Sequence, residues 1–141
     1  MITAISVIEM RMRNLPLMEK FDSFIANLNS DDRIAILHHT DPDGICSAVI
    51  LNKLVQRERN KQIDLRINQR PEEFYITQDT YKKIVDNKIN KLVITDLSVD
   101  QNKHEIIRKI EKFADILVID HHKLYKNLNS KKTIHIKPQL V

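Results

Sequence analysis

The sequence predicts an α/β fold with a mainly parallel sheet of four or five strands and helices on both faces. Short runs of β-branched and aliphatic residues alternate with segments of helical periodicity along the 141 residues. Three of these runs, Ile34–Leu37, Lys91–Thr95 and Asp115–Ile119, are largely apolar, which is typical of strands buried on both faces. Strands that alternate with helices imply right-handed crossovers and therefore parallel strands.

The first expected element is a helix after Pro16, a residue that suits the first turn of a helix. Apolar residues then recur at helical spacing, and turn-forming residues at positions 29–32 end the pattern. These apolar residues are Leu17, Phe21, Phe24, Ile25 and Leu28. We therefore expect an N-terminal helical segment at residues 1–31, whose role is packing, and an α/β unit at residues 32–141.

Two helices and a strand are expected in the middle of the chain. The first helix runs from about Gly44 to Asn60, and its apolar arc comprises Ile45, Ala48, Val49, Leu54 and Val55. The alternating segment Gln62–Asn68 predicts a strand. Residues 76–88 predict a second helix with Tyr81, Ile84 and Val85 on one face.

The last third of the chain predicts one more helix between strands. Ser98 and Gln101 have the spacing of a capping box, so we expect a helix that begins at Ser98. The apolar residues that this helix would bury are Val99, Ile106, Ile107, Ile110 and Phe113. The run Asp115–Ile119 predicts a fourth strand and Thr133–Ile136 a fifth.

Composition is that of an ordinary globular chain, with 42% hydrophobic and 30% charged residues. No apolar run approaches the roughly 20 residues that span a bilayer, and the single cysteine cannot form an internal disulfide, so we expect a cytoplasmic protein without a membrane partner.

A net charge of +4 weakly favours a polyanionic partner. The lysines after His122, among them Lys137, have an ordinary interpretation as a solvated tail. Aromatic residues are 5% of the chain, which does not indicate a base-stacking surface.

Acidic residues and histidines follow three of the predicted strands, at the point where each strand ends. The segments are HHTDPDG, DLS and DHH, and their polar residues are His39, Asp41, Asp43, Asp96, Asp120, His121 and His122. Because the carboxyl ends of parallel strands meet at one edge of a sheet, we expect these side chains to converge.

Each segment has an ordinary interpretation when taken alone. Asp-Pro-Asp-Gly is a good turn, Asp96 suits a loop beside a helix cap, and a His-His pair can be two surface imidazoles or one core and one exposed histidine. Their joint placement is not explained in this way, because crowded carboxylates raise one another's pKa unless a cation lies among them. Imidazole and carboxylate ligands without thiolate suit Mn²⁺, Mg²⁺, Zn²⁺ or Fe²⁺. We expect Cys46 to lie within the helix as a small hydrophobe rather than as a ligand.

The spacing of Asp41 and Asp43 suits a pair of cations. Two carboxylates two residues apart in a tight turn can each face a different metal ion while a third carboxylate bridges both. Two ions about 3.5–4 Å apart can hold the attacking and leaving oxygens of a phosphoryl transfer. Gly44 permits close approach of the backbone, and the start of the helix offers N–H groups to a phosphate oxygen.

The order HTDPDG, VITDLS and DHH resembles motifs one, two and three of the DHH phosphoesterase superfamily, over roughly residues 33–122. The pattern His39-x-Asp41-x-Asp43-Gly44 resembles the RecJ-like branch, which includes bacterial RecJ exonuclease, archaeal RecJ-like proteins such as the GINS-associated nuclease, and the replication factor Cdc45. The His-x-x-x-Asp-x-Asp pattern of the superfamily's phosphatases and manganese pyrophosphatases is absent, since Ile45 breaks it from His39 and Pro42 and Gly44 break it from His38.

The resemblance implies a set of residue roles. The implied metal ligands, for two Mn²⁺ or Mg²⁺ ions bridged by Asp96, are His39, Asp41, Asp43, Asp96 and His121. His122 would orient or stabilise the scissile phosphate, Asp120 would be a ligand or an anchor for the histidines, and Gly44, His122 and Lys123 would contact the substrate. The implied catalytic residues are His122, Asp120 and Asp96, and the implied substrates are ends of single-stranded DNA or RNA cut stepwise to mononucleotides.

The family pattern continues past the residues present in this chain. Relatives carry a fourth motif with a further carboxylate and then a DHHA1 domain, whereas Asp120 is the last acid here and HIKPQLV resembles the strand before motif four, with Lys137 where relatives often have asparagine. We therefore expect a metal-dependent phosphoesterase of the RecJ-like single-strand nuclease type that is truncated or needs a partner polypeptide supplying these parts.

Two alternatives stay open. The chain could be a non-catalytic Cdc45-like replication scaffold that binds GINS or helicase components, which the missing fourth motif favours and the intact first three motifs disfavour. It could also be an inactive gene fragment. An increase in thermal stability on addition of Mn²⁺ would favour the enzyme hypothesis over the scaffold hypothesis.

Overall fold

The computed structural model describes residues 16–70 and 72–140, and it confirms the predicted α/β class. Five parallel strands form one sheet in the order β2-β1-β3-β4-β5. The strands are β1 (Ile34–His39), β2 (Leu65–Gln69), β3 (Lys91–Thr95), β4 (Asp115–Ile119) and β5 (Thr133–Ile136). The helices are the one at residues 16–26, α2 (Pro42–Arg59), α3 (Gln78–Asp86), α4 (Glu105–Ile110) and the short 3₁₀ helix η1 (Pro138–Leu140).

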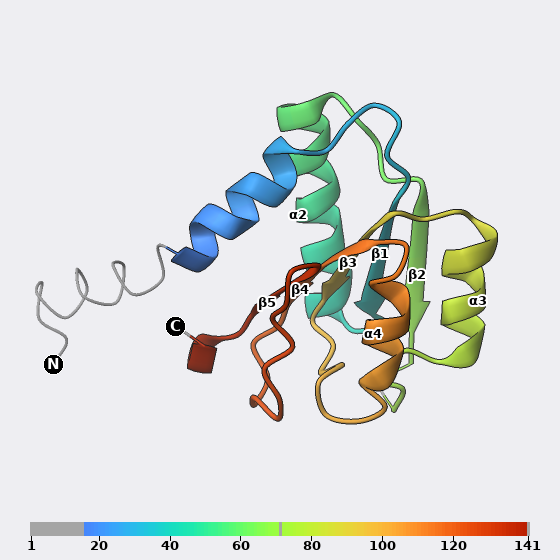
Figure 1. Ribbon diagram of the computed structural model, residues 1–141, viewed down its shortest axis with the longest axis vertical. Helices are drawn as coiled ribbons and strands as arrows, with labels where there is room; N and C mark the ends of the chain where they lie inside the picture. Colours follow the sequence, from blue (N-terminus) through green and yellow to red (C-terminus); the bar gives the residue numbers. More distant parts are fainter. Residues whose placement is uncertain (1–15, 71, 141) are drawn as a thin grey trace, which may run out of the picture.

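Helices cover both faces of the sheet (Figure 1). The helix at residues 16–26 and α2 pack on one face, where Phe24, Ala48 and Val55 meet the strand residues Ile36 and Leu117. The other face packs against α3 and α4. Alternate residues of β1 serve the two cores, because successive side chains of a strand point to opposite faces.

The order in which the chain adds strands to the sheet reverses between β1 and β3. The chain first crosses from β1 to β2 on one side, and then continues through β3, β4 and β5 on the other. In open α/β sheets ligands bind in the crevice outside the carboxyl ends of the strands at this switch point. The HHTDPDG segment begins with the last two residues of β1, and the DLS segment follows β3, so both flank the crevice.

Helix α2 differs from its prediction in its start and in its apolar arc. It begins at Pro42, because the Asp41 side chain caps it, and it ends where Asn60 adopts a left-handed conformation. Ala48 and Val55 are buried as expected, but Ile45 and Val49 are 42% and 39% exposed. Cys46 is also exposed. These side chains lie on a part of α2 that the described residues do not cover.

The predicted helix at Ser98 is wrong. Residues 98–104 form a loop, and α4 begins only at Glu105, after His104, which makes no side-chain capping bond. The hydroxyl of Ser98 instead donates to Oδ2 of the buried Asp120, so it is not available to cap a helix. Ile106, Ile107 and Ile110 are buried as predicted, Val99 is buried outside the helix, and Phe113 is 37% exposed.

Smaller differences occur at β2 and α3. The strand predicted at Gln62–Asn68 lies at Leu65–Gln69. On α3, Ile84 is buried but Val85 is exposed, because adjacent helical residues point about 100° apart and only one of them faces the sheet. Among the described helices, none is both long and apolar enough for a bilayer crossing.

Candidate metal centre

The strand register brings the polar motifs together at one edge of the sheet. His38 pairs with Thr95, Thr95 pairs with Ile119, and Ile119 pairs with Ile136. The residues that come next along these strands are His39, Asp96, Asp120 and Lys137. They therefore form a row at the carboxyl edge, which is the convergence that the strand pattern predicted.

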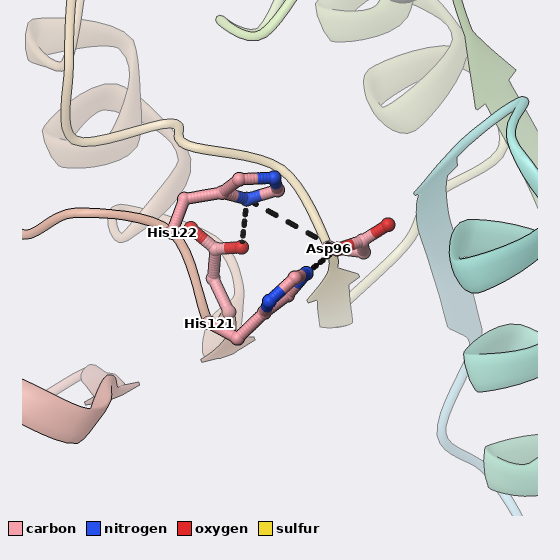
Figure 2. A group of neighbouring side chains, drawn as sticks. Asp96, His121 and His122 are labelled. Atoms are coloured by element: carbon pink, nitrogen blue, oxygen red, sulfur yellow. Dashed lines mark hydrogen bonds and ion pairs between the residues drawn. The ribbon is translucent and has the colours of Figure 1, made fainter.

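Two groups of possible metal ligands share Asp96. In the first, ligand atoms of Asp96, Asp120, His121 and His122 lie within 4.8 Å of one another. In the second, the same holds for His39, Asp41 and Asp96. Figure 2 shows the imidazole rings of His121 and His122 directed toward Asp96. A carboxylate common to two groups is the arrangement that a bridging ligand requires.

Asp96 is held in an unusual backbone conformation. Its φ is 58°, in the left-handed region that residues other than glycine seldom adopt, although aspartate tolerates it better than most. Its amide donates to the carbonyl of Ile119 at 3.0 Å, and its Oδ1 lies 2.7 Å from Nε2 of His121. Its Oδ2 is buried and accepts no hydrogen bond from the described residues.

The electrostatics of Asp96 favour a cation. Burial raises the pKa of this carboxyl and the negative charge of Asp41 raises it further, while His121 opposes the rise. A buried carboxylate with one unsatisfied oxygen and a second carboxylate beside it is costly without a compensating positive charge. The surrounding donors are imidazoles and carboxylates, which suit Mn²⁺ or Mg²⁺. The residues present therefore fit a divalent metal.

Asp120 is hydrogen-bonded to His122 and to groups of two other segments. Its Oδ1 lies 2.5 Å from Nδ1 of His122, and its Oδ2 meets Nζ of Lys137 at 3.0 Å and the Ser98 hydroxyl at 3.2 Å. The side chain of Asp120 is fully buried. Burial alone would raise the pKa of Asp120, but Lys137 and His122 lower it more, so the net shift is downward. Both of its oxygens are thus already engaged by protein groups.

Asp41, which follows β1, both caps α2 and belongs to one of the two groups of possible metal ligands. Oδ1 of Asp41 accepts from the amide of Gly44 at 2.8 Å, and its Oδ2 lies 3.0 Å from Nδ1 of His39. The bond from Gly44 is the main reason that the pKa of Asp41 is lowered, followed by the bond to His39. A Cβ at position 44 would lie 2.3 Å from the carbonyl oxygen of His39, so only glycine allows α2 to start this close to β1.

The two histidines at the end of β1 have different environments. His38 is fully buried, its Nδ1 lies 2.7 Å from the carbonyl oxygen of His39, and its Nε2 accepts from Arg66 at 3.2 Å. Burial lowers the pKa of His38, so it is neutral at pH 7. Of the two arrangements considered for a His-His pair, His38 and His39 show the one with a core histidine and a more exposed neighbour.

A cavity of about 490 Å³ adjoins the centre. Its polar wall contains Asp43, Asp96, Asp120 and His121. The apolar wall consists of Phe21, Ile50, Leu51, Leu54 and Ile119. Asp43 belongs to neither of the two ligand groups but faces the same cavity as Asp96 and His121.

Sequence reasoning missed two residues, Lys137 and Asp100. The Lys137 side chain is fully buried, which corrects its assignment to a solvated tail. Its ammonium contacts Asp100 Oδ1 at 2.8 Å, Asp120 Oδ2 at 3.0 Å and the carbonyl oxygen of Lys123 at 2.7 Å. A signal was present, because Lys137 follows the fifth strand at the point where Asp120 follows the fourth.

Residues 33–140 match the family model described as the DHH family, N-terminal domain. The chain belongs to the DHH family. Its name-giving motif is Asp120-His121-His122, at the end of β4. A sequence search of curated proteins finds no match for this DHH chain.

Several solved structures share the fold of the DHH chain, including the following two. Exonuclease RecJ bound to manganese is 18% identical with a TM-score of 0.60, over 84% of this chain and 30% of RecJ. The DHH domain of a protein described as a member of a family of ribosomal proteins is 15% identical with a TM-score of 0.68, over 99% of this chain and 37% of that one. The chain therefore spans about a third of the length of these two structures, with 30% and 37% covered.

Proposed function

We propose that this DHH chain carries the metal centre of a phosphoesterase of the RecJ-like type, acting on phosphodiester bonds at the ends of single-stranded DNA or RNA. The observation that carries the proposal is the position of Asp96, which belongs to both ligand groups and has a buried oxygen without a hydrogen bond from the described residues. The fold shared with a RecJ exonuclease bound to manganese supports the choice of metal.

The proposed ligands divide between two Mn²⁺ or Mg²⁺ ions. His39 and Asp41 would hold one ion and His121 the other, and Asp96, which belongs to both groups, would be shared between them. Asp43, which lines the same cavity as Asp96, would supply a further carboxylate. When bound, the ions supply positive charge at the phosphate and acidify water.

The proposed role of His122 is to contact the scissile phosphate. Its Nδ1 is held by Asp120 at 2.5 Å, which leaves Nε2 of this half-exposed ring for a phosphate oxygen. Lys123 follows directly and adds a positive charge at the rim. The amide of Gly44 already donates to Asp41, so the contribution of Gly44 is close approach of the backbone rather than an amide bond to substrate.

The first test is the effect of Mn²⁺ on the melting temperature of EDTA-treated protein. At about a hundred times the dissociation constant we expect a rise of roughly 5 °C or more. Asp96→Asn keeps the size and the backbone tolerance of Asp96 and should abolish the rise. Asp79→Asn, at an exposed position on α3, is the matched control and should leave it intact. No rise in the unaltered protein would contradict the metal centre and favour the scaffold alternative.

The second half of the test is catalysis. We expect Mn²⁺-dependent cleavage of bis(p-nitrophenyl) phosphate and of an end-labelled single-stranded oligonucleotide, and loss of both in His121→Ala. Activity that survives EDTA and His121→Ala would come from a contaminant. Mn²⁺ binding with no hydrolysis of either substrate would mean that catalysis needs the partner polypeptide expected from the sequence.

A further inference from the structure

The loop at residues 123–126, directly after the histidine pair, exposes an aromatic ring. Tyr125 is 50% exposed, more than any other large aromatic side chain among the described residues. Nζ of Lys123 lies 5.6 Å from the centroid of its ring. The roles proposed above for the metal ligands and His122 make no use of this ring.

The backbone under Tyr125 is fixed by a buried ion pair. The amides of Tyr125 and Lys126 both donate to Oδ2 of Asp100, at 2.8 and 3.1 Å. Lys137 binds the other oxygen of Asp100 at 2.8 Å and the carbonyl oxygen of Lys123 at 2.7 Å. Since Asp100 and Lys137 are each 1% exposed, the loop rests on a rigid base. Because the backbone of this loop is already held, the loop loses little conformational freedom when a ligand binds to it.

The same ion pair connects Tyr125 with the proposed metal centre. Nζ of Lys137 lies 5.9 Å from the ring centroid of Tyr125 and 3.0 Å from Oδ2 of Asp120, whose other oxygen holds His122. The Lys137 ammonium thus lies between the ring of Tyr125 and the carboxylate of Asp120, which holds the proposed phosphate-contacting residue His122. The loop between β4 and β5 extends past the carboxyl ends of the strands, where the motifs gather (Figure 1).

We infer that Tyr125 is a nucleobase subsite, on which the base next to the scissile phosphate stacks while Lys123 contacts the phosphate backbone. This inference rests on the proposed function and adds that the chain recognises the bases of the strand as well as its phosphates. Stacking suits a single strand because every base presents a π face. Lys123, whose ammonium lies over the ring, supplies the charge that a phosphate requires.

The competing interpretation is that the ring of Tyr125 only shields the Lys137 ammonium from water. On that interpretation, truncation of the ring would change stability and leave the recognition of bases unchanged. The two interpretations therefore differ in base discrimination, which can be measured without any catalytic turnover.

The test compares binding of two five-residue phosphorothioate strands in Mn²⁺ by fluorescence anisotropy, one of thymidine and one abasic. We expect the intact chain to prefer the thymidine strand by about tenfold, and Tyr125→Ala to reduce this ratio to about one. Tyr125→Phe keeps the aromatic face and should keep the preference. Tyr125→Leu keeps an apolar side chain over Lys137 but no aromatic face and should lose the preference, which covers the case in which Tyr125→Ala unfolds. Lys123→Gln should weaken both strands equally. Equal binding of the two strands by the intact chain, or binding of neither, would overturn the inference.

Failure of this inference is distinguishable from failure of the proposed function. Bis(p-nitrophenyl) phosphate carries no base, so its Mn²⁺-dependent hydrolysis tests the metal centre alone. Hydrolysis together with equal binding of thymidine and abasic strands would refute the subsite and leave the phosphoesterase proposal standing.

A second readout uses tyrosine fluorescence, because the chain has three tyrosines and no tryptophan. Stacking of a base on Tyr125 should quench part of the emission when the thymidine strand is added, and Tyr125→Phe should remove that quenching. Tyr81→Phe is the matched control, since Tyr81 lies on α3 against Phe113, and it should preserve the quenching. Quenching that persists unchanged in Tyr125→Phe would overturn the inference.

Discussion

Two of the six histidines, His38 and His135, are fully buried in the core. The amide of Leu128 donates to Nδ1 of His135 at 3.1 Å, and Asn129 bonds to the backbone N–H and C=O of His135. His135 thereby ties the loop between β4 and β5 to its own strand. Burial lowers the pKa of His135 to about 4, so the ring is neutral at physiological pH.

This depressed pKa predicts that acid weakens the fold. The unfolded chain binds a proton at His135 near the ordinary pKa of 6.5, whereas the folded chain binds it only near 4. The stabilisation is complete above pH 6.5 and is lost as the pH falls toward 4, by a total of about 3 kcal/mol. His135→Asn keeps an acceptor for Leu128 and should flatten the dependence in urea unfolding at pH 7, 5.5 and 4.5. An unchanged slope in this variant would show that other groups cause the loss.

At the scale of the element, α2 and the site depend on the same side chain. One oxygen of Asp41 caps the helix by accepting from Gly44, and the other meets His39. Because the cap fixes the direction of the Asp41 side chain, the start of α2 also fixes a proposed metal ligand. The helix N-terminus is therefore part of the site as well as part of the scaffold.

Replacement of Asp41 by serine separates these two roles. Serine is a good N-cap, so Asp41→Ser should retain stability within about 0.5 kcal/mol, whereas Asp41→Ala should cost about 1 kcal/mol. Both variants should reduce the Mn²⁺-induced rise in melting temperature, because both remove the carboxylate. Urea unfolding without metal and thermal melts with Mn²⁺ measure the two effects. A full Mn²⁺ response in Asp41→Ser would exclude Asp41 as a ligand.

At the scale of the whole molecule, one buried lysine joins the segments that follow three neighbouring strands. Asp100 lies beyond β3, Asp120 and Lys123 lie beyond β4, and Lys137 lies beyond β5. The Lys137 ammonium contacts all three of the others. It pairs with two buried carboxylates, so β5 contributes to the candidate metal centre although it supplies none of the proposed ligands.

We expect Lys137→Met to destabilise the fold by about 3–5 kcal/mol, because it removes the ammonium that pairs with the buried carboxylates of Asp100 and Asp120. The exposed Lys131 on the preceding loop offers a matched control, and Lys131→Met should change stability by less than about 0.5 kcal/mol. Chemical denaturation at pH 7 measures both. Similar small effects of the two substitutions would mean that Asp100 and Asp120 do not depend on Lys137 for their charge balance.

Much of this architecture was predictable because its signals are local. The apolar runs at β1, β3, β4 and β5 identify strands by composition, and parallel pairing then brings the DHH motif beside the first two motifs. The wrong prediction of a helix at Ser98 has a non-local cause, since Ser98 had the local signature of a helix cap but bonds to Asp120, which lies 22 residues away. Local patterns carry no information on which distant group competes for a hydroxyl.

The sequence by itself determined the α/β class, the strand segments and the residues gathered at one edge of the sheet, because side-chain periodicity and turn chemistry act over a few residues. Only the tertiary structure decided that His38 is buried while His39 faces the centre, that Asp96 belongs to both ligand groups, and that Lys137 lies buried beneath the loop with Tyr125. These features depend on the register between strands and on burial, and both are set by contacts between residues far apart in the chain.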